Sequence, residues 1–302
     1  MKGGIVLFLL ALFASPATAH VIAPPDAPPG WTFEASVTVP LLLVAGLFSV
    51  GFARLYVRSG PGLGALRRRA MLFALGWLCL AGAVVSPLHQ AGARSFTAHM
   101  IEHELMMLAA APLMVMAEPL AVMLWALPHD ARAGIARLVR TGAVLQPWRL
   151  ATDPIFATLA QAAVLWLWHA PALFNRALAS EGWHTVQHLS FLISALLFWS
   201  AVLHGRARRN GYGPAALCLF ATSVVSGALG AFMALSQSPW YARYAALGLA
   251  PFGLTPTEDQ QLAGLLMWIP GGLVHAVAAL LLIAKALRAP PRPAVIKGTR
   301  PG

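Results

Sequence analysis

Long apolar runs separated by short polar connections dominate the chain. Each run is about as long as a helix needs to cross the roughly 30 Å hydrocarbon core of a bilayer. Because the bilayer core offers backbone groups no water to bond, such spans are helices or closed barrels, and runs of this length indicate helices. The pattern predicts seven spans: Val37–Tyr56, Ala70–Pro87, Met100–Leu127, Ile155–Ala172, Val186–His204, Ala215–Leu235 and Leu262–Leu287. We therefore expect an all-α integral membrane protein with seven transmembrane helices, formed by residues 37–288.

The first residues have a different pattern. Lys2 precedes an apolar stretch at 5–14 that is too short to cross a bilayer, and Ala17-Thr18-Ala19 follows it. This order is typical of a secretory signal peptide. The expected limits are a signal peptide at 1–19, an external segment at 20–36 and a disordered cytoplasmic tail at 289–302. Cleavage would make His20 the N-terminus, where its α-amine and imidazole together could chelate copper, so His20 is a possible metal ligand.

Composition and charge agree with a membrane protein. Hydrophobic residues make up 59% of the 302 residues and charged residues only 10%, unlike an ordinary soluble domain. Cytoplasmic loops of membrane proteins are rich in lysine and arginine. With the N-terminus outside and the C-terminus in the cytoplasm, seventeen of the 21 basic residues fall on the cytoplasmic side, against Arg94, Arg176 and Arg243 outside. The net charge of +11 thus indicates topology and contact with membrane lipid, and we expect no nucleic-acid partner.

Six of the ten histidines form two matching groups. His99-Met-Ile-Glu-His103 and His184-Thr-Val-Gln-His188 both have the pattern H-x-x-[EQ]-H, and His89 and His169 precede them. On a helix, residues four apart project from one face. In the predicted topology all six lie at the external ends of two similar hairpins, which could be related as parallel repeats. The predicted metal ligands are therefore His89, His99, His103, His169, His184 and His188.

Five methionines follow the first histidine pair in the third predicted span, and two of them have helical spacing from His103. Met107 and Met114 lie four and eleven residues beyond His103, so a continuous α-helix would place them on the same face. Thioether and imidazole together favour Cu(I) over hard cations. Met107 and Met114 are therefore possible additional metal ligands, although methionine is also a common filler of apolar helices.

Three polar residues are candidate partners of the ligands rather than ligands themselves. Glu102 and Gln187 each precede the second histidine of a pair, where they could fix a histidine tautomer or could face the headgroups. Asp259 lies at the start of the last span, on the histidine side of the membrane. Its carboxylate could stabilise the start of the helix, or it could contact the metal ligands from outside the site. His275 lies midway along that span, where we expect a buried histidine bonded to a neighbouring carbonyl.

Several spaced motifs in one order resemble the multi-span CtaG-type cytochrome c oxidase assembly proteins of bacteria. They are the two histidine pairs, Pro112, W-x-W-H-x-P at Trp166–Pro171, S-P-W-Y at Ser238–Tyr241 and E-D-Q-Q-x-A-G-x-x-M-W-x-P-G-G at Glu258–Gly272. The resemblance covers about residues 37 to 287. It implies a non-enzymatic factor of the bacterial inner membrane that helps mature the haem–copper oxidase. The expected cofactor is copper, and the expected partners are oxidase subunits or other copper chaperones.

Two other functions fit the histidines. A b-type haem protein would use histidines of facing helices as axial ligands of haem b. An intramembrane zinc peptidase would use His99–His103 as an H-x-x-E-H motif with Glu102 as its catalytic carboxylate. The second pair has Gln187 where that carboxylate would stand, which disfavours the peptidase.

Overall fold

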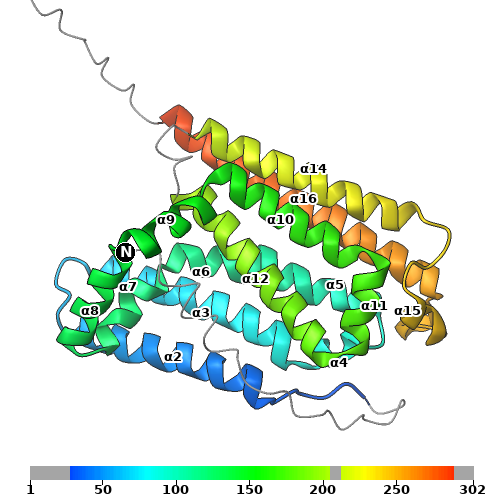
Figure 1. Cartoon of the computed structure of the whole chain (residues 1–302), viewed down its shortest axis with the longest axis horizontal. Coiled ribbons are helices and arrows are strands. Elements are labelled where there is room, and N and C mark those ends of the chain that lie inside the picture. Colours follow the sequence, from blue (N-terminus) through cyan, green and yellow to red (C-terminus); the bar gives the residue numbers. More distant parts are fainter. Residues whose placement is uncertain (1–27, 205–211, 289–302) are drawn as a thin grey trace, which may run out of the picture.

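The computed structural model describes residues 28–204 and 212–288, and within these ranges all regular structure is helical (Figure 1). The long helices are α2 (Ala35–Tyr56), α3 (Leu63–Val85), α10 (Pro154–His169), α12 (Glu181–His204), α14 (Gly213–Leu235) and α16 (Pro256–Arg288). A composite helix consists of α5 (Phe96–Glu104), the π-helix η1 (Leu105–Ala110) and α6 (Ala111–Ala117). The short helices are α4 (Pro87–Gly92), α7 (Pro119–Met123), η2 (Leu124–Ala126), α8 (His129–Val139), α9 (Gly142–Ala151), α11 (Pro171–Ala179), α15 (Ala242–Ala246) and η3 (Pro251–Gly253). The expected signal peptide at 1–19, His20 and the tail at 289–302 lie outside the described residues.

The described helices confirm the all-α membrane class. Six are long and apolar enough to cross a bilayer: α2, α3, the composite helix, α12, α14 and α16. The seventh candidate is the pair α9 and α10, which meet at a bend of 68°. Asp153 stands at this bend, and its carboxylate accepts the backbone N–H groups of Ile155 and Phe156. Since a side-chain acceptor at this position satisfies the first free N–H groups of a helix, α10 starts anew there.

The third span is shorter than predicted. Its apolar run continues to Leu127, but the helix ends at Ala117 because Glu118 has a left-handed backbone, with φ of 47°. Pro119 disfavours the helical conformation for the residue before it, which explains the break. The carboxylate of Glu118 lies 2.9 Å from Arg69 and 3.3 Å from His204.

Two glycines allow α14 and α16 to pack closely along their length. A Cβ atom on Gly264 would lie 2.5 Å from the carbonyl oxygen of Gly230, and one on Gly230 would lie 2.7 Å from the carbonyl oxygen of Gly264. Small residues at such crossings let membrane helices approach closely. The pair α14 and α16 forms one side of the bundle and α2 the opposite side (Figure 1).

The interior of the bundle is built around the composite helix, α10, α12, α14 and α16. A smaller apolar cluster joins α2 and α3 to α7. On the outer faces, large apolar side chains such as Leu42, Leu217 and Leu280 are exposed. Such faces are expected where helices contact lipid tails.

The two ends of the bundle differ in chemistry. The short helices α4, α11 and α15 lie at one end, and α7, α8 and α9 lie at the other (Figure 1). We call the end with α4, α11 and α15 the histidine end, because the two histidine pairs begin there. Of the described basic residues, Arg94, Arg176 and Arg243 belong to this end, and the others belong to the opposite end. Which end faces the cytoplasm stays a prediction.

Candidate metal centre

Two helix starts bring four histidine rings into contact. His99 and His103 lie on α5 with ring centres 4.4 Å apart. His184 and His188 lie in the same way on α12, 4.1 Å apart. Between the helices, the ring centres of His103 and His188 are 5.0 Å apart. His89, on α4, adds a fifth ring 5.4 Å from that of His184. We call these five residues the histidine cluster.

Ring atoms of the cluster approach one another as metal ligands would. One nitrogen from each of His99, His103 and His188 lies within 4.8 Å of the other two. Atoms of His89, Glu102 and His188 form a second set with the same property, so His188 belongs to both. Nitrogens bound to one ion at about 2.0–2.1 Å lie about 3.3 Å apart in a tetrahedral site. Small side-chain rotations would therefore complete either set.

The cluster is buried on one side and open on another. His99 and His103 are only 2% and 4% exposed. The side chains of His89 and His188 keep 19% and 12% of their surface exposed. An ion would therefore enter between α4 and α12 and reach the deeper imidazoles from there.

Tyr244 fixes the tautomer of His99. Its hydroxyl donates to the carbonyl of Gly92 at 2.6 Å and lies 3.3 Å from Nδ1 of His99. Burial raises the pKa of Tyr244 well above its ordinary value, as do the charges of Asp259 and Glu102, so the hydroxyl keeps its single proton. Because that proton is directed at Gly92, Nδ1 of His99 is the donor toward Tyr244. The other nitrogen, Nε2, then has a lone pair for a metal.

Several buried ring nitrogens have no hydrogen-bond partner among the described residues. They are Nε2 of His99, both nitrogens of His103 and Nε2 of His188. A buried polar atom without a partner costs free energy, and native proteins rarely leave several together. Their convergence is what a site for a bound ion requires.

Glu102 lies directly under the cluster. It is fully buried, and its Oε1 atom is 2.7 Å from Nδ1 of His89 and 3.6 Å from Nδ1 of His188. Burial alone would lower the pKa of His89, but the hydrogen bond to Glu102 and the charge of its carboxylate raise it above its ordinary value. Glu102 thus orients His89, and the part of the chain that the structure describes offers its Oε2 atom no partner. Gln187, its counterpart in the second pair, is also fully buried.

His169 lies beside the cluster rather than in either ligand set. Its Nδ1 donates to the carbonyl of Leu165 at 2.7 Å, and its buried Nε2 has no partner within residues 28–204 and 212–288. Phe174 is 5.9 Å from the ring of His169 and 5.2 Å from that of His99. Phe191 likewise contacts both His169 and His103. Two aromatic rings therefore separate His169 from the first histidine pair.

Asp259 anchors the start of the helix that carries the first pair. Its carboxylate accepts hydrogen bonds from the hydroxyl of Ser95 at 2.9 Å and from the backbone N–H of Phe96 at 2.6 Å. The hydroxyl of Thr97 donates to the Asp259 carbonyl at 2.9 Å. Asp259 therefore caps α5 from α16. The carboxylate expected near the ligands acts on their helix and bonds no histidine ring among the described residues.

Comparison with known proteins identifies the family. A model of the cytochrome c oxidase caa3 assembly factor family (Caa3_CtaG) matches residues 38–289. The chain belongs to this family. No curated protein and no solved structure matches it. The resemblance inferred from the spaced motifs is confirmed, and the chain is a multi-pass cytochrome c oxidase assembly factor whose role implies contact with the oxidase or its assembly machinery.

Two tyrosines hold parts of the site in this assembly factor, and the sequence pattern did not predict this role. The hydroxyl of Tyr241 donates to the carbonyl of His169 at 3.0 Å, and Tyr244 holds His99 as described. Gln260 positions the loop before them, because its Oε1 accepts the N–H of Trp240 at 2.6 Å. The available signal was the S-P-W-Y motif with a tyrosine three residues later, which predicts a fixed loop but not its partner.

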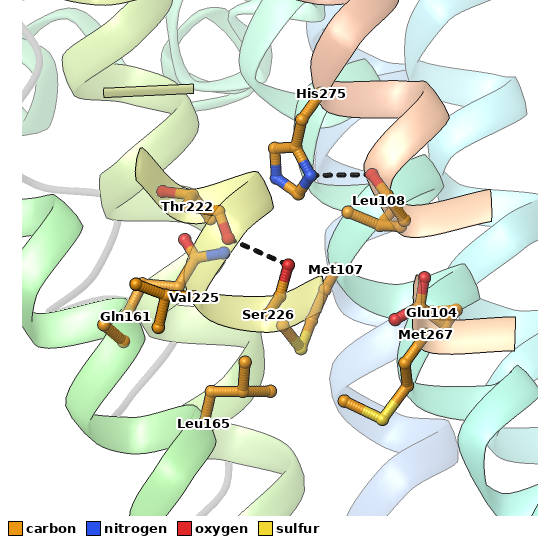
Figure 2. Close-up of a pocket in the computed structure, with 12 residues that line it drawn as sticks. Glu104, Met107, Leu108, Gln161, Leu165, Thr222, Val225, Ser226, Met267 and His275 are labelled. Atoms are coloured by element: carbon orange, nitrogen blue, oxygen red, sulfur yellow. Dashed lines mark hydrogen bonds between the residues drawn. The ribbon is translucent and has the colours of Figure 1, made fainter. Parts of the chain in front are cut away.

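The two methionines predicted as additional ligands pack against different helices, and their ligand role stays a prediction. Met107 lies in η1 and lines a cavity among α10, α14 and α16 (Figure 2). Met114 packs against α3, where a Cβ atom on Gly76 would lie 3.2 Å from its Cγ. The common face expected for an α-helix is lost because the π-helix changes the rotation per residue. His275 has its expected bond, since its Nδ1 donates to the Gly271 carbonyl at 2.7 Å.

The donor set of the cluster suits a borderline or soft ion. It offers imidazole nitrogens from three elements and a single carboxylate, without a thiolate. Imidazole suits Zn, Cu, Fe and Ni, whereas Ca and Mg prefer oxygen ligands. Of the remaining histidines, His129 and His204 lie at the opposite end of the bundle.

Proposed function

We propose that this assembly factor binds copper at the histidine cluster, on the external side of the bacterial inner membrane, and assists maturation of the oxidase copper centres. The observation that carries the proposal is the approach of nitrogens from His99, His103 and His188 to within 4.8 Å of one another. Membership of an oxidase assembly family supports copper over other metals that imidazole binds.

Access to the cluster supports transfer rather than permanent storage of the ion. His89 and His188 are partly exposed, so an ion could pass from them to the deeper His99 and His103. A partner docked against α4 and α12 would meet the exposed imidazoles first. We expect that partner to be an oxidase subunit or another copper chaperone.

The environment of Glu102 disfavours the peptidase. A catalytic carboxylate must activate a water molecule and needs access to substrate. Glu102 is fully buried and is hydrogen-bonded to His89. We therefore propose a binding function and no hydrolytic one.

Metal analysis of the purified protein tests the proposal. Wild-type protein is compared with a variant carrying His99→Ala, His103→Ala and His188→Ala, and with a His129→Ala control. His129 is exposed at the opposite end of the bundle, so its loss should leave copper content unchanged. We expect the triple variant to lose the copper that shows imidazole ligation. Equal imidazole-ligated copper in all three proteins would refute the proposal, and a Soret band in the wild type would favour the haem b alternative.

A further inference from the structure

Two short helices, α8 and α9, lie at the end of the bundle opposite the histidine cluster (Figure 1). Neither helix has a buried residue, so both lie outside the packed interior. α10 runs beside α14, and α9 turns away from it at the bend of 68°. α9 therefore runs across the end of the bundle rather than along it. We call the outer face of these two helices the α8–α9 surface.

Each of the two helices carries an apolar face. Residues spaced i, i+4 and i+7 lie on one side of a helix. Apolar residues have this spacing once on α8 and once on α9: Ala131, Ile135 and Leu138, and Ala143, Pro147 and Leu150. Ile135 is partly exposed and the other five are exposed. Leu138 and Leu150 each keep 59% of their surface exposed, so the described chain leaves both apolar faces largely uncovered.

Arginines border these apolar faces. Three exposed arginines lie along the two helices and their connection: Arg137, Arg140 and Arg149. Arg132 of α8 and Arg58, which follows α2, both lie over the ring of Trp125, at 4.3 and 5.6 Å from its centre. No ion pair joins any of these five arginines to a carboxylate among the described residues. Two guanidinium groups at one indole repel each other, and a phosphate bound by both would offset that repulsion.

The chain fixes the depth of the α8–α9 surface in the membrane. Only Thr152 and Asp153 separate α9 from α10, so α9 ends where that span begins. Before α8, Arg54 in the last turn of α2 donates to the carbonyls of Trp125 and Ala126 at 3.2 and 3.0 Å. Both ends of the segment are thus held at the ends of spans. This is the level where hydrocarbon meets headgroups, and amphipathic helices with basic edges lie in that plane.

We propose that the α8–α9 surface lies in the headgroup layer and binds anionic phospholipid. The apolar faces of α8 and α9 contact the acyl chains, and Arg58 and Arg132 bind a lipid phosphate beside Trp125. Arginines without carboxylate partners favour a headgroup of net negative charge over a zwitterionic one. The depth of both helix ends favours lipid over a protein partner. This binding does not depend on copper at the histidine cluster.

Native mass spectrometry of the purified full-length protein tests the proposal, with phosphatidylglycerol as the anionic probe and phosphatidylcholine as the zwitterionic one. The site variant carries Arg58→Gln and Arg132→Gln. The control carries Arg68→Gln and Lys285→Gln, which remove two exposed positive charges at the same end but outside the surface. We expect the tightest-bound phosphatidylglycerol to bind about tenfold or more weakly in the site variant. Binding in the control should stay within about twofold of wild type.

A second variant tests the apolar faces without changing any charge. Leu138→Ser with Leu150→Ser removes contact with acyl chains, so phosphatidylglycerol should again bind more weakly than in wild type. Both leucines are exposed, so folding should be unaffected, and thermal unfolding in detergent checks this.

Four results would overturn the inference. Equal binding in the site variant and the control would mean that only net charge matters. Equal affinity of wild type for the two lipids would remove the preference for an anionic headgroup. Displacement of phosphatidylglycerol by excess inorganic phosphate would indicate a site for free anions. Unchanged lipid binding with loss of co-purified oxidase in the site variant would make the α8–α9 surface a protein interface.

Discussion

The carboxylate of Asp259, at the start of α16, accepts a hydrogen bond of 2.6 Å from the backbone N–H of Phe96, at the start of α5. This bond joins two helix starts that are 163 residues apart in sequence. Since His99 lies one turn beyond Phe96, the position of the first histidine pair depends on Asp259, whose described hydrogen bonds go to Ser95, Phe96 and Thr97 and to no histidine.

Asp259→Ala should therefore weaken metal binding without removing a ligand. The change leaves the hydroxyl of Ser95 and the N–H of Phe96 without their acceptor, which should cost about 1–3 kcal/mol of stability. We expect copper affinity at the cluster to fall by about tenfold or more, as for other residues that orient ligands. Chelator competition measures the affinity. Glu258→Ala is the matched control, because that neighbouring carboxylate bonds only Thr255 among the described residues.

Tyr244→Phe should weaken copper binding through its effect on His99. The variant keeps the ring packing but removes the hydroxyl that bonds Gly92 and faces Nδ1 of His99. With the tautomer no longer fixed, we expect weaker copper binding and a small loss of thermal stability. Tyr56→Phe, whose hydroxyl accepts from Arg67 at the opposite end, should leave copper binding unchanged. Equal copper affinity in both variants would show that Tyr244 does not orient the ligand.

Gly264→Ala should destabilise the crossing of α14 and α16. The added Cβ would lie 2.5 Å from the Gly230 carbonyl, so the helices must separate, at a cost of about 1–3 kcal/mol. Thermal unfolding in detergent measures this loss. Gly272→Ala, on the same helix, places its Cβ at an ordinary 3.6 Å from Ser223 and should unfold close to the wild-type temperature. A Gly264→Ala protein as stable as Gly272→Ala would contradict the close packing.

Reporter fusions test the orientation of the bundle. The distribution of basic residues predicts that Arg69 lies on the cytoplasmic side of the membrane and that Arg94 lies on the external side. A fusion after each residue should therefore report opposite sides of the membrane. If both report the same side, the topology is wrong and the cluster loses its external position.

Periodicity and composition predicted the features that depend on local sequence. Apolar run lengths located the helices, and the i, i+4 spacing of His99 with His103 placed both rings on one face. The break at Glu118 was missed because run length takes no account of a proline at the next position. The prediction that Met107 and Met114 share a helix face was wrong, because a π-helix cannot be recognised from hydrophobicity alone.

The sequence pattern could not predict contacts between residues far apart in the chain. Tyr244 and His99 lie 145 residues apart, and no local spacing predicts that a hydroxyl fixes that imidazole. Four helices line the cavity, so no local spacing could predict that Glu104, Gln161 and His275 lie around it. His275 itself was expected to bond a neighbouring carbonyl, which is confirmed.

Cytochrome c oxidase activity in cells is the most direct test of the central claim. A variant with His103→Ala and His188→Ala loses one deeply buried ligand, His103, and the ligand that both sets share, His188. His129→Ala, in contrast, changes an exposed residue at the opposite end of the bundle. If the cluster supplies copper, the double variant should lose oxidase activity as a deletion does, with the oxidase polypeptides still made and partial rescue by added copper, while His129→Ala stays normal. Normal oxidase activity in the double variant, with the protein present at the wild-type level, would contradict the account.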